Sequence, residues 1–245
     1  GLAGDALTDA DYNVAIGTSA LTGDTLGSRS VAIGDSALAS QNFTTATDAY
    51  NVGVGYNAGG NISTGVENTL IGGLAGDALT TGYQNVAMGF ESLTADTKGV
   101  ATVAIGVSAL KNQNHTTVTS TYNTAVGYVA GRDTTTGRRN TFIGALAAYD
   151  AANGDDNTIV GYDAGEKNTG SSNTIIGSSA SPILTSGNDN TFVGALAGDT
   201  CTTGSFNTVL GKGADVGTGA ASGRIAIGIN VNTTANDTIS VGAGT

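Results

Sequence analysis

Residues 68–89, NTLIGGLAGDALTTGYQNVAMG, decide the fold. They hold two copies of a short pattern that ends in an aliphatic residue and a marker glycine, and the two glycines are 17 residues apart. A fixed period of this size is the signature of a solenoid, in which each repeat buries its apolar face against its neighbours. The marker recurs 14 times, at Gly17, Gly34, Gly55, Gly72, Gly89, Gly106, Gly127, Gly144, Gly161, Gly177, Gly194, Gly211, Gly228 and Gly242.

The three residues before each marker glycine have the composition of a short β-strand. In the quoted copy they are Thr69, Leu70 and Ile71, and β-branched or aliphatic residues recur at these places. We therefore predict an all-β fold, a parallel β-solenoid (a β-roll or β-helix) of about fourteen coils of about 17 residues. The uninterrupted period predicts a single repetitive domain over residues 1–245.

The strand is apolar on both of its faces. Alternation places the residues one and three before the glycine on one face, which we interpret as the core. The residue between them should then point outward, yet it is Leu70, Phe142 or Ile159 in different coils. A strand that is apolar on both faces is buried on both faces. Either the coil folds back on itself, or identical chains pack there around a common axis.

An asparagine stands four residues before the marker glycine in ten coils. Side-chain amides stacked at strand spacing, about 4.8 Å, can hydrogen-bond along the stack as a ladder. The alternative is that asparagine tolerates the backbone of a turn at this position. Ser30, Thr102 and Arg224 interrupt the series. The predicted ladder comprises Asn13, Asn51, Asn68, Asn85, Asn123, Asn140, Asn157, Asn173, Asn190 and Asn207.

Composition excludes several classes of function. The net charge of −11 and the scattered basic residues argue against nucleic-acid binding. The sequence contains no apolar stretch of the roughly 18 residues that could span a membrane, so we expect no membrane insertion by this segment. Residues 1–8, GLAGDALT, repeat residues 73–80, so the chain opens in the middle of a coil and is expected to be a piece of a longer protein.

Two coils carry four extra residues each, and the two inserts resemble one another. Residues 42–47, NFTTAT, match residues 114–119, NHTTVT, and each insert is followed by Tyr-Asn. Loops on a rigid scaffold are common binding sites, so Phe43, Tyr50, His115 and Tyr122 are candidate contact residues. The alternative is a tolerated insertion without a ligand. A second candidate set directly follows marker glycines and is suited to stacking on sugars or to covering a neighbouring strand: Tyr56, Tyr128 and Tyr162.

Catalytic chemistry has little support in the sequence. An enzyme needs convergent groups of matched pKa, but the chain has one histidine and one cysteine and no nucleophile, phosphate or metal motif. We therefore predict that the protein is not an enzyme, uses no cofactor and has no metal site.

The repeats resemble those of known surface fibres. Residues 30–37, SVAIGDSA, resemble the head repeat of trimeric autotransporter adhesins, and residues 140–144, NTFIG, resemble repeats of bacteriophage tail fibres. The resemblance implies a left-handed parallel β-roll, trimeric, displayed on a cell surface or a virion and used for attachment. This sequence departs from the adhesin pattern in its longer repeat, and the coiled-coil stalk and membrane anchor of that family are expected to lie outside residues 1–245.

We therefore expect an extracellular or virion-surface fibre or adhesin segment. Its partners would be identical chains, in a homotrimer or a filament, and a cell-surface glycan or protein receptor. The alternative function is that of a subunit in an extracellular filament. A third, ice binding, requires ranks of threonines on a flat face, and the threonines at 80–81, 134–136 and 202–203 offer only a broken rank.

Overall fold

The computed structural model describes residues 2–242, and it divides the chain into two compact units, Gly1–Asn123 and Thr124–Thr245. Each unit is a stack of parallel β coils, and the described residues contain no helix. The two units together hold about 13 coils, since fourteen marked strands bound thirteen intervals. The predicted all-β parallel solenoid is confirmed.

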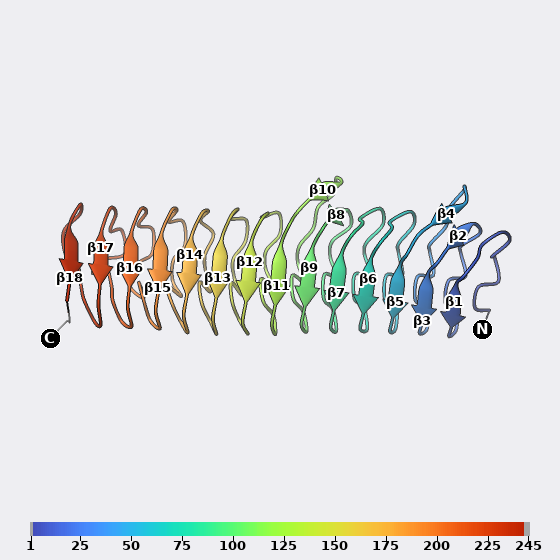
Figure 1. Cartoon of the computed structure of the whole chain (residues 1–245), viewed down its shortest axis with the longest axis horizontal. Coiled ribbons are helices and arrows are strands. Elements are labelled where there is room, and N and C mark those ends of the chain that lie inside the picture. Colours follow the sequence, from blue (N-terminus) through green and yellow to red (C-terminus); the bar gives the residue numbers. More distant parts are fainter. Residues whose placement is uncertain (1, 243–245) are drawn as a thin grey trace. The chain divides into compact units, whose positions relative to one another are not determined.

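The strands of each unit lie side by side in the order of the sequence (Figure 1). Every pairing is parallel and joins equivalent positions, so that Thr69, Leu70 and Ile71 face Val86, Ala87 and Met88. In the first unit the strands that precede marker glycines are β1 (Val14–Ile16), β3 (Val31–Ile33), β5 (Val52–Val54), β6 (Thr69–Ile71), β7 (Val86–Met88) and β9 (Val103–Ile105). In the second they are β11 (Thr124–Val126), β12 (Thr141–Ile143), β13 (Thr158–Val160), β14 (Thr174–Ile176), β15 (Thr191–Val193), β16 (Thr208–Leu210), β17 (Ile225–Ile227) and β18 (Ile239–Val241).

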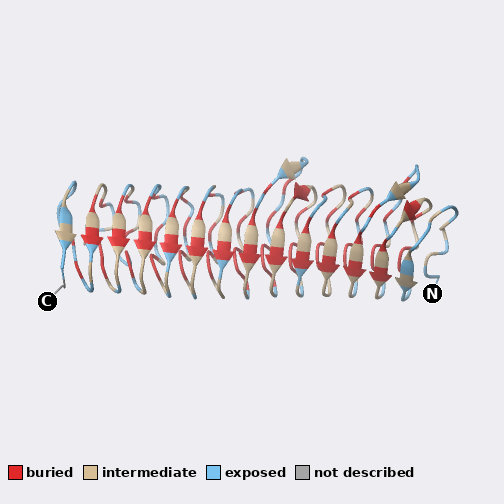
Figure 2. Ribbon diagram, in the orientation of Figure 1, coloured by how far each residue is buried: buried red, intermediate tan, exposed pale blue. Residues whose placement is uncertain are grey.

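Each strand turns its middle residue inward, which reverses the predicted orientation. Leu70 is fully buried, whereas Thr69 and Ile71 on either side of it are only partly covered. The same alternation of a buried centre between more exposed ends is visible along both units in Figure 2. The prediction that the residues one and three before the glycine lie in the core is therefore wrong. Both faces are apolar, so the pattern alone could not distinguish inside from outside.

Large and small residues complement one another in the thin core, within a coil or between neighbouring coils. In several coils with an alanine at the strand centre, a leucine six residues later fills the space, as Leu93 does for Ala87. At Gly53 the later position is also glycine, and Leu38 of the preceding coil lies against it instead. Where the centre is Leu70, that later position is Gly76, and a Cβ there would lie 2.8 Å from a Leu70 methyl. Close packing of this kind leaves no room for independent changes in volume.

The glycines mark places where the backbones of successive coils touch. A Cβ added to Gly72 would lie 2.6 Å from the carbonyl oxygen of Gly89, and Gly72 also has a φ of 134°. A second glycine lies seven residues before the marker glycine in many coils, for example Gly82 before Gly89. It is needed only because the backbones of two successive coils approach each other closely there. Its Cβ would lie 2.5 Å from the carbonyl oxygen of Gly99, and its φ is not positive. The left-handed residue of that turn is Gln84, with a φ of 59°.

The asparagines form hydrogen-bonded ladders inside each unit. The Oδ1 of Asn51 accepts hydrogen bonds from both the backbone N–H (3.0 Å) and the Nδ2 (3.2 Å) of Asn68, and Asn68 Oδ1 accepts the same pair from Asn85. Each Nδ2 also donates to a glycine carbonyl of the following coil, as from Asn68 to Gly82 at 3.0 Å. These side chains are fully buried, so the ladder satisfies backbone groups that would otherwise lack a partner.

Where another residue replaces a ladder asparagine in the insert coils, a glutamine side chain completes the hydrogen bonds. Thr102 replaces one asparagine, and the amide of Gln113 donates to its hydroxyl at 3.1 Å and to the buried carboxylate of Asp96 at 2.6 Å. Gln113 Oε1 then accepts from Asn123 Nδ2 at 2.7 Å. Ser30, Gln41 and Asp24 make the equivalent cluster in the other insert coil. In the second unit, Arg224 N–H donates to Asn207 Oδ1 and its guanidinium donates to the Thr233 carbonyl.

Removing one rung of the ladder should destabilise the fold. We expect Asn68→Ala to lower the free energy of unfolding by about 2–4 kcal/mol, because several buried backbone and amide groups lose their partners together. Urea denaturation followed by circular dichroism measures the change. Thr64→Ala, at an exposed position, is the matched control and should change it by less than about 0.5 kcal/mol. Equal effects of the two substitutions would contradict this role for the ladder.

Candidate functional site

The outer face of the strands is a regular surface of each unit, repeated at every strand that precedes a marker glycine. It presents two side chains per strand, the residues one and three before the marker glycine, and neither is charged in any strand. Several of these side chains are well exposed, including Met88 at 38% and Ile143 at 42%. An apolar surface of this regularity marks an interaction site more often than chance exposure does.

The outer face differs in composition between the two units. In the first unit the residue three before the glycine is valine in every strand except β6, where it is Thr69. In the second unit a rank of threonines occupies the same position beside a rank of aliphatic residues. It comprises Thr124, Thr141, Thr158, Thr174, Thr191 and Thr208. The sequence prediction placed the residue three before the marker glycine in the core, and so it did not identify these threonines as a surface feature.

The inserts project from the coil, but two of the predicted contact residues do not. The insert strand β4 (Thr47–Asp48) pairs with β2 (Gly27–Ser28), and β10 (Thr119–Ser120) pairs with β8 (Gly99–Val100). Phe43 and His115 point inward and are 5% and 6% exposed. The expectation that these two side chains offer surface contacts is therefore wrong, because each is buried beneath its insert. The exposed tips of the inserts are residues 44–46 and 116–118.

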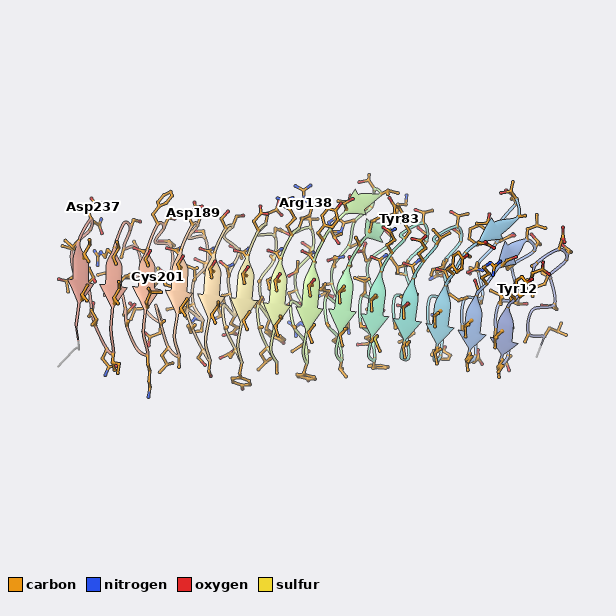
Figure 3. The ribbon with its side chains drawn as sticks, in the orientation of Figure 1. Tyr12, Tyr83, Arg138, Asp189, Cys201 and Asp237 are labelled. Carbon is orange, nitrogen blue, oxygen red and sulfur yellow. The ribbon has the colours of Figure 1, made fainter. Side chains whose placement is uncertain are left out.

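Tyr50 and Tyr122 lie at the edge where the chain enters the strands, and they are 51% and 61% exposed. Arg29 lies between two rings there, 4.8 Å from the centroid of Tyr12 and 5.9 Å from that of Tyr50. Its guanidinium also pairs with Asp48 at 2.9 Å. The same edge in the second unit carries charged side chains, among them Arg138, Asp189 and Asp237 (Figure 3). Sequence reasoning missed Tyr12 and Arg29, which lie outside the inserts.

The second predicted set lies at the opposite edge, where the chain leaves the strands. Tyr56, Tyr128 and Tyr162 are each about three-fifths exposed. The structure adds Phe90, which is 51% exposed and directly follows Gly89 in the same way. A signal was present in the sequence, because Phe90 aligns with Tyr162 in the 72-residue super-repeat that also relates the two inserts. The structure does not bring this set together with Tyr50, because strand β5 separates Tyr50 from Tyr56.

The buried polar cluster beneath the second insert has an unusual member. Both ring nitrogens of His115 lack a hydrogen-bond partner, and Nδ1 is 3.8 Å from Asp96 Oδ2, too far for a hydrogen bond. Burial by itself raises the pKa of the Asp96 carboxyl. The neighbouring imidazole and the hydrogen bonds from Gln113 and the His115 N–H outweigh burial, so the pKa of Asp96 lies below 3.8.

Other kinds of site were sought in the described part of the chain. Within residues 2–242 there is no group of three or more His, Cys, Asp or Glu residues arranged to hold a metal ion, and no pocket. None of the described residues belongs to a helix long and apolar enough to cross a membrane. Cys201 is buried and unpaired, and burial raises the pKa of its thiol to about 11.

Comparison with known proteins gave no match: no family model, no curated protein and no solved structure is similar to this chain at a significant level.

The two insert coils offer a matched test of the buried histidine. Phe43 occupies the place of His115 in the other insert, with the same backbone hydrogen bond to a buried aspartate. At neutral pH we expect His115→Phe to raise the free energy of unfolding by about 1–3 kcal/mol, because it removes two buried unpaired nitrogens. Phe43→His should lower it by a similar amount. Thermal or urea unfolding measures both, and a destabilised His115→Phe variant would count against this account.

The lowered pKa of Asp96 predicts sensitivity to acid. A carboxyl group whose pKa is lower in the folded chain stabilises the fold above its unfolded value of 3.8, and that stabilisation is lost as the pH falls through the lower, folded value. We therefore expect wild type to lose more unfolding free energy than Asp96→Asn as the pH drops from neutral to below 3.8. Urea denaturation across this range tests the prediction, and parallel curves for the two proteins would refute it.

Proposed function

We propose that the chain is a non-catalytic segment of a homo-oligomeric fibre on a cell surface or a virion, and that the fibre mediates attachment. The observation that carries the proposal is the uncharged, largely apolar outer face of the strands in a protein of net charge −11. Charges are kept away from this face in every coil, as expected for a surface that is covered in the working assembly.

Identical chains are the occupants that best fit this face. The face repeats at every strand, so a partner that covers it evenly must carry a matching repeat. A second copy of the chain supplies that repeat by symmetry. We propose three copies around a common axis, each a left-handed coil, in keeping with the resemblance to trimeric adhesin heads and tail fibres. Attachment would then use the edges of the coils and the insert tips, which such a packing leaves outside.

Ice binding is a second candidate, supported by the regular rank of threonines on the outer face of the second unit. The threonines of the second unit lie on adjacent strands, about 4.8 Å apart, beside an aliphatic rank about two residues along the strand. The same face cannot serve both functions at once. A monomeric chain would leave it free to bind ice, whereas an oligomer would cover it.

The mass of the purified chain in solution separates these functions. Light scattering should give three times the 23.9 kDa chain mass. Replacing two outward residues, Val160→Lys with Val193→Lys, should convert the oligomer to monomers with unchanged circular dichroism, because charges would be buried at the interface. The matched control, Thr136→Lys with Thr203→Lys, alters exposed residues away from this face.

A monomer at every concentration would refute the fibre proposal. Ice binding then becomes testable by thermal hysteresis of the monomer, with Thr158→Lys as the disrupting variant. A ladder of sizes in place of one mass would favour the extracellular filament.

A further inference from the structure

Each unit carries a pair of exposed aromatic rings in one column at the edge where the strands end. In the first unit the rings belong to Tyr56 and Phe90, and in the second to Tyr128 and Tyr162. All four follow a marker glycine directly. We call these pairs the aromatic rows of the two units.

Backbone hydrogen bonds fix the spacing within each row. Leu74 N–H donates to the Tyr56 carbonyl (2.8 Å), and Glu91 N–H donates to the Gly73 carbonyl (3.0 Å). Tyr56, Gly73 and Phe90 thus occupy equivalent places in three successive coils, so the two rings start about 9.6 Å apart, twice the strand spacing. Equivalent bonds, from Leu146 to Tyr128 and from Asp163 to Ala145, give the second unit the same spacing.

A small residue lies between the two rings of each row. A Cβ on Gly73 would lie 3.4 Å from Cδ2 and 3.8 Å from Cε2 of Phe90, so this ring leans over the glycine of the preceding coil. One side of the ring is then covered by backbone while about half of the side chain stays exposed. In the second unit Ala145 takes the place of Gly73. The super-repeat thus keeps the order aromatic, small, aromatic in both units.

We propose that each aromatic row binds an extended, neutral, β-1,4-linked polysaccharide, with its two rings stacking on alternate sugars. This inference rests on the proposed attachment function and names the class of ligand. A β-1,4-linked chain is flat, and every second sugar presents the same apolar ring face, which suits two aromatic faces separated by a small residue. Aromatic rings combine a large apolar face with low conformational freedom, as such stacking requires.

Charge and position support this ligand. The net charge of −11 repels acidic polysaccharides, so a neutral chain is favoured. The rows lie beyond the ends of the strands, and so outside the apolar face that the proposed oligomer covers.

The proposal is tested on the full chain by native gel electrophoresis in gels that contain hydroxyethyl cellulose, glycol chitin or, as the acidic probe, alginate. We expect both neutral polymers, or one of them, to slow the protein and alginate not to. Slowing in the hydroxyethyl cellulose gel identifies the sugar as glucose, and slowing in the glycol chitin gel identifies it as N-acetylglucosamine. Each ring replaced by alanine should weaken binding by roughly twofold to tenfold. Phe206→Ala and Tyr83→Ala, which remove exposed rings at the other edge, are the matched controls.

A register variant tests the spacing itself. In a chain that lacks the first row (Tyr56→Ala, Phe90→Ala), Tyr128→Ala with Ala145→Tyr keeps two rings in the second unit but moves them to adjacent coils. It should bind as weakly as Tyr128→Ala alone. Retained binding by the register variant would overturn the proposal, as would equal losses in the controls or no slowing in either neutral gel. Light scattering of the same variants keeps this result separate from the oligomer, which row substitutions should leave intact.

Discussion

The structure depends on the direct stacking of backbone on backbone at the marker glycines. At Gly194 an added Cβ would lie 2.5 Å from the carbonyl oxygen of Gly211, so no other residue fits without moving a coil. This contact holds equivalent positions of successive coils at strand spacing. The asparagine ladder, the parallel strand pairs and the column of corner residues all follow from that register.

The coils are thin, and side-chain size is constrained differently in their interior and on their outer face. Inside, large and small side chains must complement one another within a coil or between neighbouring coils, and so Ile159 lies against Gly165 and Phe192 against Gly198. Outside, nothing within the chain limits the size of a side chain. The outer face nevertheless remains uncharged in every strand, while charged residues collect at the edges. The fold itself does not require this face to be uncharged, so we attribute the absence of charge to a partner chain that covers it. This is the basis of the proposed oligomer.

The insert coils show how a solenoid accepts an irregularity. Four extra residues would break the ladder, and a buried cluster of aspartate and glutamine closes the gap at each insert. Gln41 and Gln113 were absent from the sequence predictions because nothing in the local pattern says that a glutamine eleven residues away replaces a missing asparagine. Phe43 and His115 were assigned to the surface for a related reason. Loops are usually exposed, but here the second residue of each insert is buried beneath it.

The sequence by itself determined the repeat, the parallel coils, the positions of the strands and the candidate ladder residues, because a fixed period forces equivalent residues into equivalent places. It also located Tyr56, Tyr128 and Tyr162 at one corner. Only the tertiary structure decided which face of the strand is the core. When both faces of a strand are apolar, the alternation of residues does not indicate which face is buried. That depends on the side on which the rest of the coil closes. The threonine rank and the ring of Phe90 became visible as surface features only once that choice was known.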